Sequence, residues 1–288
     1  MTKGREFLGA SQGRLLAADE PAPVELENEA GPAPFFLICD HATAFIPAAL
    51  NKLGLDEAEL ARHIALDIGA AAVTRLLARQ LEARALLSHF SRLVIDPNRW
   101  PEDPTLIPQI SDGTVVPGNR DLGAEGVEVR KAAFYRPYHA AIEAEFEQRL
   151  ARGETPALIS MHSFTPVMRG AERPWQVGIL WREDGRIAEP LIERLRRRGL
   201  VVGDNEPYSA REGLGHTVEV HAEPRGLPCV LIEVRQDLID TRQGAVEWAA
   251  ILAEELRPVL DGLTCRRGHP ERGLERDQER DQERETSP

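Results

Sequence analysis

The stretch FFLICDH, residues 35–41, places five apolar residues in a row and then two polar ones, Asp40 and His41. Such a run is typical of a strand that is buried on both faces, as in a parallel sheet. Further short apolar runs, which we expect to form strands, lie at residues 85–95 (one strand or two), 157–161, 176–181, 200–202, 217–220 and 229–234. Helical patterns separate them at residues 56–81, 127–150, 186–198 and 242–260. This alternation predicts a three-layer α/β fold, with helices flanking a mostly parallel, twisted sheet.

The chain of 288 residues divides into a main domain and two polar ends. Residues 1–34 are polar and punctuated by Pro and Gly, so we expect an N-terminal extension around the fold. The main domain is expected at residues 35–262, which is enough chain for one large α/β core. Residues 263–288 contain the quasi-repeat ERDQ twice and almost nothing apolar to bury, which predicts a disordered charged tail.

The composition excludes several classes of protein. The net charge of -12 argues against binding to nucleic acid, because phosphates attract cationic side chains. No apolar run approaches the roughly 18 residues that span a bilayer, and the N-terminus lacks the apolar core of a secretory signal. We therefore expect a cytoplasmic protein without a membrane partner. Three widely spaced cysteines support neither a disulfide framework nor a cysteine-only zinc site.

Polar residues directly after strands are the first candidates for a site, because ligands of an open parallel sheet bind beyond the carboxyl ends of its strands. His41 follows FFLIC and His162 follows ALISM, so both imidazoles should meet at one edge of the sheet. Asp67 lies on the apolar stripe of the predicted helix 56–81 and should face inward. Together they form an N, O, N set that suits Zn²⁺ or another divalent transition metal. The alternative for Asp67 is a buried ion pair with Arg92.

Glu233 is the candidate general base, because it lies near the end of the apolar run CVLIEV and a partly desolvated carboxylate has a raised pKa. Its alternative role is a salt bridge with Arg235 or a neighbour. A competing cluster is HTVEVH, residues 216–221, where Glu219 and His221 would share one face of a strand and chelate the metal themselves. Otherwise His221 would line the pocket. No HExxH, GxSxG, GxGxxG or P-loop motif offers another scheme.

The order of motifs from residue 35 to residue 256 resembles that of the N-formylglutamate amidohydrolase family. The similar segments are CDHATAFIP, ALDIGA, SRLVIDPNR, SDGTVVPGN, FYRPYH, ISMHSFTPVMRG, RPWQVGILW, VGDNEPYS and HTVEVHAEPRGLPCVLIEVRQDLI. The resemblance implies a fold similar to zinc exopeptidases and the hydrolysis of N-formyl-L-glutamate to formate and glutamate, a step in histidine breakdown. A more distant likeness to zinc-dependent cell-wall amidases implies that His41, Asp67 and His162 are the ligands and that Glu233 ends a late strand.

The implied substrate is a small anionic N-acyl amino acid, whose carboxylates must be bound by local arginines against the overall negative charge. The residues expected to bind it or to shape its pocket are Arg92, Asn98, Arg99, Asn205, Tyr208 and Arg235. Arg235 or His221 would stabilise the developing oxyanion. Two alternatives are an amidase or deacylase of different N-acyl specificity and a non-catalytic metabolite-binding protein on the same fold.

Overall fold

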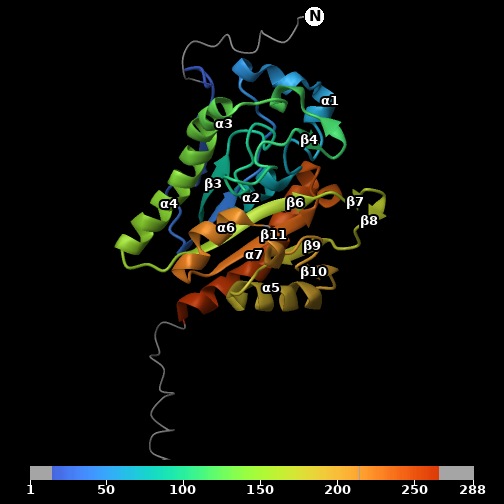
Figure 1. Cartoon of the computed structure of the whole chain (residues 1–288). Helices are drawn as coiled ribbons and strands as arrows, with labels where there is room; N and C mark the ends of the chain where they lie inside the picture. Colours follow the sequence, from blue (N-terminus) through green and yellow to red (C-terminus); the bar gives the residue numbers. More distant parts are fainter. Residues whose placement is uncertain (1–14, 214, 266–288) are drawn as a thin grey trace, which may run out of the picture.

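The computed structural model describes residues 15–213 and 215–265. Its centre is a sheet of seven strands in the order β1-β3-β2-β6-β11-β9-β10 (Figure 1). The strands are β1 (Val24–Glu27), β2 (Phe35–Cys39), β3 (Arg84–Ser88), β6 (Ala157–Phe164), β9 (Val177–Leu180), β10 (Val202–Asp204) and β11 (Cys229–Arg235). Neighbours run parallel except in the pairs β1–β3 and β11–β9. The predicted, mostly parallel sheet is therefore confirmed.

Helices cover both faces of this sheet, because alternate residues of a buried strand point to opposite layers. In β2, Leu37 packs into one core cluster and Ile38 into the other. The helices of the first layer are α2 (Ala70–Gln80), α5 (Gly185–Arg197) and α7 (Arg242–Cys265). The main helix of the second layer is α4 (Arg136–Ala151), and Figure 1 shows it on the side of the sheet opposite α5 and α7. The predicted three layers are thus present.

Three predicted helices are present with small shifts at their ends. Residues 186–198 and 242–260 correspond to α5 and α7. Residues 127–150 correspond to one continuous helical segment, in which α3 (Ala124–Arg130) passes through a π-helical turn (Lys131–Tyr135) into α4. The π turn was not predicted from the sequence.

The predicted helix at residues 56–81 is wrong in its middle. Helix α1 (Glu57–Leu60) ends after four residues, turns follow, and α2 begins at Ala70. Gly69, just before α2, has a φ of +80°, and a Cβ at this position would lie 2.3 Å from the carbonyl oxygen of Ile239. The left-handed conformation at Gly69 interrupts the helix, and only glycine fits against Ile239. Asp67 therefore lies in a turn and not on a helical stripe.

Two strand predictions are also corrected. Residues 217–220 lie in the short helix α6 (His216–His221), which follows Gly215 with its φ of +112°. In the predicted run 85–95, β3 ends at Ser88 and the remaining residues form turns and irregular backbone. Both segments are largely buried, and apolar content alone does not distinguish a buried strand from a buried helix or turn.

The remaining elements lie at the ends of the chain and in its loops. Within the predicted N-terminal extension, β1 forms an edge strand that was not predicted. Two hairpins, β4–β5 (Ile110–Ser111 and Thr114–Val115) and β7–β8 (Val167–Met168 and Ala171–Glu172), rise from the long loops. The predicted tail lies outside the described residues from 266 onward. No helix in the described part of the chain is long and apolar enough to cross a membrane.

Candidate metal centre

Three neighbouring strands bring polar side chains together on one face of the sheet. Ser160 and His162 of β6 share this face, because side chains alternate along a strand. Glu233 of β11 pairs in register with His162 and therefore points the same way. Asp40 and His41 follow directly on β2, which borders β6 on its other side. These side chains thus gather at the edge of the sheet where polar residues were expected.

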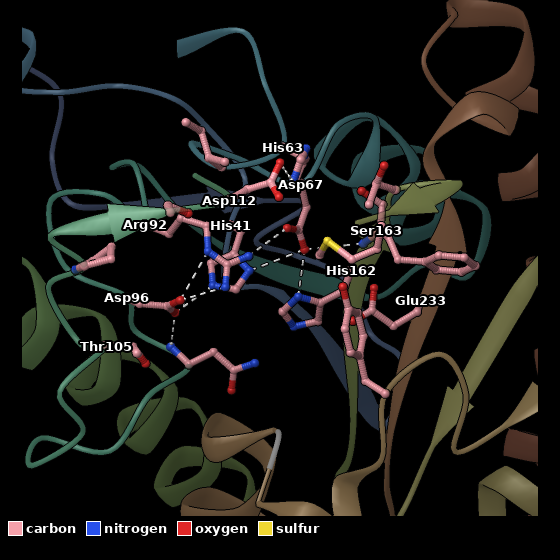
Figure 2. Close-up of a pocket in the computed structure, with 18 of the residues that line it drawn as sticks. His41, His63, Asp67, Arg92, Asp96, Thr105, Asp112, His162, Ser163 and Glu233 are labelled. Atoms are coloured by element: carbon pink, nitrogen blue, oxygen red, sulfur yellow. Dashed lines mark hydrogen bonds and ion pairs between the residues drawn. The ribbon is translucent and has the colours of Figure 1, made fainter. Parts of the chain in front are cut away.

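Two histidines and one aspartate converge at this edge. His41, Asp67 and His162 each offer a ligand atom, these atoms lie within 4.8 Å of one another, and all three residues are buried. Nδ1 of His41 lies 3.3 Å and Nδ1 of His162 lies 2.8 Å from Oδ2 of Asp67, as Figure 2 shows. The backbone N–H of Asp67 donates to the carbonyl of His41 at 3.0 Å, which fixes the turn. Two imidazole nitrogens and one carboxylate oxygen are a ligand set of catalytic zinc sites.

A second carboxylate contacts the other ring nitrogen, Nε2, of each imidazole. Nε2 of His41 lies 2.7 Å from Oδ1 of Asp96, and Nε2 of His162 lies 2.9 Å from Oδ2 of Asp40. Burial opposes protonation, but the carboxylates at both nitrogens of each ring raise the pKa of His41 and of His162. With a cation between these rings and Asp67, the outer carboxylate would keep the Nε2–H proton and leave the lone pair of Nδ1 to the cation. This is the arrangement of metal-binding histidines in proteins, where the outer carboxylate fixes the tautomer of the ring.

Asp40 is held by more donors than His162 alone. Its carboxylate also accepts hydrogen bonds from the hydroxyls of Tyr138 (2.9 Å), Thr217 (2.8 Å) and Ser160 (3.2 Å). Complete burial would raise the pKa of Asp40, but His162, His41 and the hydroxyl of Thr217 outweigh it and lower the pKa to about 2. The carboxylate is therefore charged at neutral pH although it is inaccessible to water.

Arg92 bridges the two aspartates nearest to His41. Its Nη1 lies 3.2 Å from Oδ1 of Asp67, and its Nη2 lies 2.7 Å from Oδ2 of Asp96. The predicted alternative of an Arg92–Asp67 ion pair is thus what the structure contains, but it exists together with the histidine contacts. Because Arg92 occupies Oδ1 of Asp67, Oδ2 is left for His41 and His162. Both ends of the guanidinium are therefore engaged by buried carboxylates, although Arg92 also lines the neighbouring pocket.

Glu233 lies in the same pocket and has an unsatisfied oxygen. Its Oε2 is buried and has no hydrogen-bond partner. Burial, opposed by the neighbouring histidines, raises the pKa of this carboxyl to about 7. Figure 2 shows Glu233 beside His162, across from Asp67. A carboxyl group whose pKa lies near neutral pH can both take up and release a proton, as a general base must.

The pocket around these residues has a volume of about 360 Å³, within the range of small-molecule sites. Four of the residues expected to contact a substrate line it, and these are Arg92, Asn98, Arg99 and Tyr208. Both loop hairpins contribute to its wall, β4–β5 through Ile110 and β7–β8 through Met168. The cavity thus combines the histidine–aspartate group with cationic and polar side chains.

Four other predicted site residues lie elsewhere. Glu219 accepts from Arg182 at 2.6 Å, and Nε2 of His221 lies 2.8 Å from a ring nitrogen of His139. The expectation that Glu219 and His221 share a strand face is wrong, because residues 216–221 are helical and the two side chains diverge. The other two, Arg235 and Asn205, are occupied with Asp237 (2.7 Å) and with the backbone N–H of Trp181 (3.1 Å). None of the four lines the cavity.

The contacts of Asp40 and Asp96 with the two histidines were not predicted from the sequence. Asp40 directly follows the strand FFLIC, and Asp96 ends the run LVID, so both had the same sequence signal as His41. What was missing was the pairing of each carboxylate with one particular imidazole, which depends on the three-dimensional arrangement.

Comparison with known proteins identifies the family and related structures. The model of the N-formylglutamate amidohydrolase family matches residues 33–240. The Agrobacterium tumefaciens gene product Atu2144 has a crystal structure that is 37% identical, with a TM-score of 0.85 over 87% of this chain and 100% of its own. An N-formylglutamate amidohydrolase from Ralstonia eutropha JMP134 shares the fold at 21% identity, with a TM-score of 0.62 over 83% of this chain and 99% of its own. No curated protein gave a significant match. From the match over residues 33–240, the chain belongs to the N-formylglutamate amidohydrolase family.

Proposed function

We propose that the chain is a metal-dependent amidohydrolase with His41, Asp67 and His162 as the protein ligands. The observation that carries this proposal is that both Nδ1 atoms converge on Oδ2 of Asp67 while each Nε2 faces its own carboxylate. This donor set fits zinc, with another divalent transition metal as the alternative. Three protein ligands leave room for water or substrate at a fourth position.

In such a site the metal supplies an activated water at neutral pH and polarises the carbonyl of the scissile amide. Glu233 is the proposed general base. Its unsatisfied Oε2 takes a proton from the attacking water, whose oxygen bonds to the acyl carbon. When the C–N bond breaks, Glu233 returns this proton to the nitrogen of the leaving amine. The products are a carboxylic acid, formate in the case of an N-formyl substrate, and a free amino acid.

The charges of the cavity favour a substrate with two carboxylates. Three arginines line it, and Arg92 is engaged with Asp67 and Asp96. Within the described residues, Arg99 and Arg169 form no ion pair, and Nη1 of Arg99 donates only to the carbonyl of Asn98 at 3.0 Å. N-formyl-L-glutamate carries two carboxylates, one for each uncommitted guanidinium. We therefore infer that it is the substrate.

Two further proposals rest on membership of the N-formylglutamate amidohydrolase family. Hydrolysis of N-formyl-L-glutamate would serve histidine breakdown, and we propose that the reaction takes place in the cytoplasm. Asn98 and Tyr208, which line the cavity, are proposed to contact the substrate next to Arg99.

A substrate panel tests the proposed activity. The purified, zinc-loaded protein should release formate from N-formyl-L-glutamate much faster than it releases acetate from N-acetyl-L-glutamate or cleaves a peptide amide. Faster release of acetate would point to a deacylase of different specificity. Binding of these compounds without any hydrolysis would point to a non-catalytic binding protein and would overturn the proposal.

A further inference from the structure

The segment of residues 89–101 carries much of the proposed site but has no helix or strand. Arg92 and Asp96 support the metal ligands, while Asn98 and Arg99 line the cavity. Residues 93–98 are all buried. A buried loop is unusual, because its backbone N–H and C=O groups lack the partners that a helix or strand would supply. Something else must therefore satisfy these groups and fix the position of the loop.

Side chains from a single helical segment supply several of these partners. Nη1 of Arg130 donates to the carbonyl of Val94 at 2.9 Å. The ring of His139 donates from Nε2 to the carbonyl of Pro97 at 3.0 Å, and the hydroxyl of Tyr135 donates to the carbonyl of Arg99 at 3.1 Å. We call Arg130, Tyr135 and His139 the loop clamp.

The three clamp residues share one side of the helix because of the π turn between α3 and α4. In a regular α-helix, residues four apart lie on the same face, and this holds for Tyr135 and His139, whose ring centroids are 4.2 Å apart. Arg130 is five residues before Tyr135, a spacing that a π turn accommodates and a plain α-helix does not. The turn at Lys131–Tyr135 thus aligns all three donors with the loop.

The protonation states of the clamp are set by its surroundings. Burial lowers the pKa of His139 to about 3, so the ring is neutral. Its Nε2–H faces the carbonyl of Pro97, which leaves Nδ1 to accept from Nε2–H of His221 at 2.8 Å. Tyr135 can donate to Arg99 while its oxygen accepts from Nε2–H of His216 at 2.6 Å. Each clamp ring is therefore oriented by a second histidine.

We propose that the loop clamp is a set of positioning residues that places Asn98 and Arg99 for substrate binding. The clamp bonds end on the carbonyls of Val94, Pro97 and Arg99, within and before these two residues. None of the three clamp residues lines the cavity. The side chain of Asn98 is held in addition by the backbone N–H of Thr217, at 3.0 Å, and this bond does not involve the clamp. The inference rests on the proposed function, since it assigns the clamp to binding of the carboxylate substrate by Arg99.

Variants of the clamp test this proposal in the zinc-loaded full chain. Tyr135→Phe removes the bond to Arg99, and His139→Ala removes the bond to Pro97. We expect each to raise the KM for N-formyl-L-glutamate about fivefold and to leave kcat within about twofold. His139→Gln retains an N–H donor near the place of Nε2 and should restore most of the affinity. Zinc should remain stoichiometric, because His41 and Arg92 still hold Asp96.

A control and a second readout separate positioning from general destabilisation. Ile142→Val removes a buried methyl group from α4 without touching the clamp, and should leave KM unchanged. Amide hydrogen exchange of residues 93–99 should become faster in Tyr135→Phe and His139→Ala than in the wild type or Ile142→Val. If KM and exchange are both unchanged in the clamp variants, the proposal is overturned. If the wild-type protein releases no formate, the proposed function is refuted instead. Amide hydrogen exchange of residues 93–99 would then be the readout that tests whether the clamp holds the loop.

Discussion

Replacing Asp40 with Asn removes one charge from the centre of the site and changes almost no volume. Asp40 accepts hydrogen bonds from His162, Tyr138, Thr217 and Ser160. Its pKa is lowered from 3.8 to about 2, which corresponds to about 2 kcal/mol of stability. Because the folded pKa is the lower one, this stability is present above about pH 4 and is lost as the pH falls toward 2. We expect Asp40→Asn to lose about 2 kcal/mol at pH 7 and less at pH 3.

The same change should weaken the metal site. An Asn amide can donate to Nε2 of His162, which would move the ring proton to Nδ1 and turn the proposed ligand atom into a donor. Loss of an outer carboxylate typically lowers metal affinity 10- to 100-fold, and we expect a loss of about that size here. Urea unfolding of the metal-free protein measures the loss of stability, and zinc competition with a chelator measures the loss of metal affinity.

Ser160→Ala is the matched control for Asp40→Asn. It removes one of the four donors but keeps the carboxylate and its contact with His162. Its zinc affinity should stay within a few-fold of the wild type. If Asp40→Asn binds zinc as tightly as the wild type and loses less than about 0.5 kcal/mol, the assigned role of Asp40 is refuted.

Two further predictions concern catalysis and substrate. Glu233→Gln should lower kcat by about 10²- to 10⁴-fold with full zinc content, because the base is lost and the ligands remain. Activity near that of the wild type, measured as formate release, would place the base on another group. Arg99→Ala and Arg169→Ala should each raise the KM for N-formyl-L-glutamate about tenfold or more. N-formyl-L-alanine has a single carboxylate, so only one of the two variants should raise the KM for this substrate. If both variants raise the KM for both substrates equally, the assignment of one guanidinium to each carboxylate is contradicted.

The sequence predicted the central sheet well because each buried strand is a short apolar run with polar residues at its ends. FFLIC and ALISM are of this kind, and they placed His41 and His162 correctly at one edge. Apolar content could not reveal whether a buried segment is extended. Residues 217–220 are helical and follow Gly215, whose positive φ turns the chain before them. Residues 89–95 bond to partners far away in the sequence, such as Pro23, Phe45 and Arg130.

The site was predictable where it depended on one strand and not where it depended on contacts between elements. Asp67 was assigned to the inward face of a predicted helix, yet it reaches the histidines from a turn that its backbone N–H bond to His41 fixes. Arg92 was expected to bind substrate, but two buried aspartates engage it. In the same way, Arg235 ends β11 and Asn205 follows β10. Both look available in the sequence, but Asp237 engages Arg235 and the backbone N–H of Trp181 donates to Asn205.

Under the proposed function, amide hydrolysis depends on one metal ion bound by His41, Asp67 and His162. The most direct test is to strip the protein with a chelator, add zinc in steps, and measure bound zinc and formate release from N-formyl-L-glutamate at each step. We predict no release without metal, a linear rise that ends at one equivalent, and neither binding nor activity in His162→Ala. Full formate release by the metal-free protein would contradict the claim.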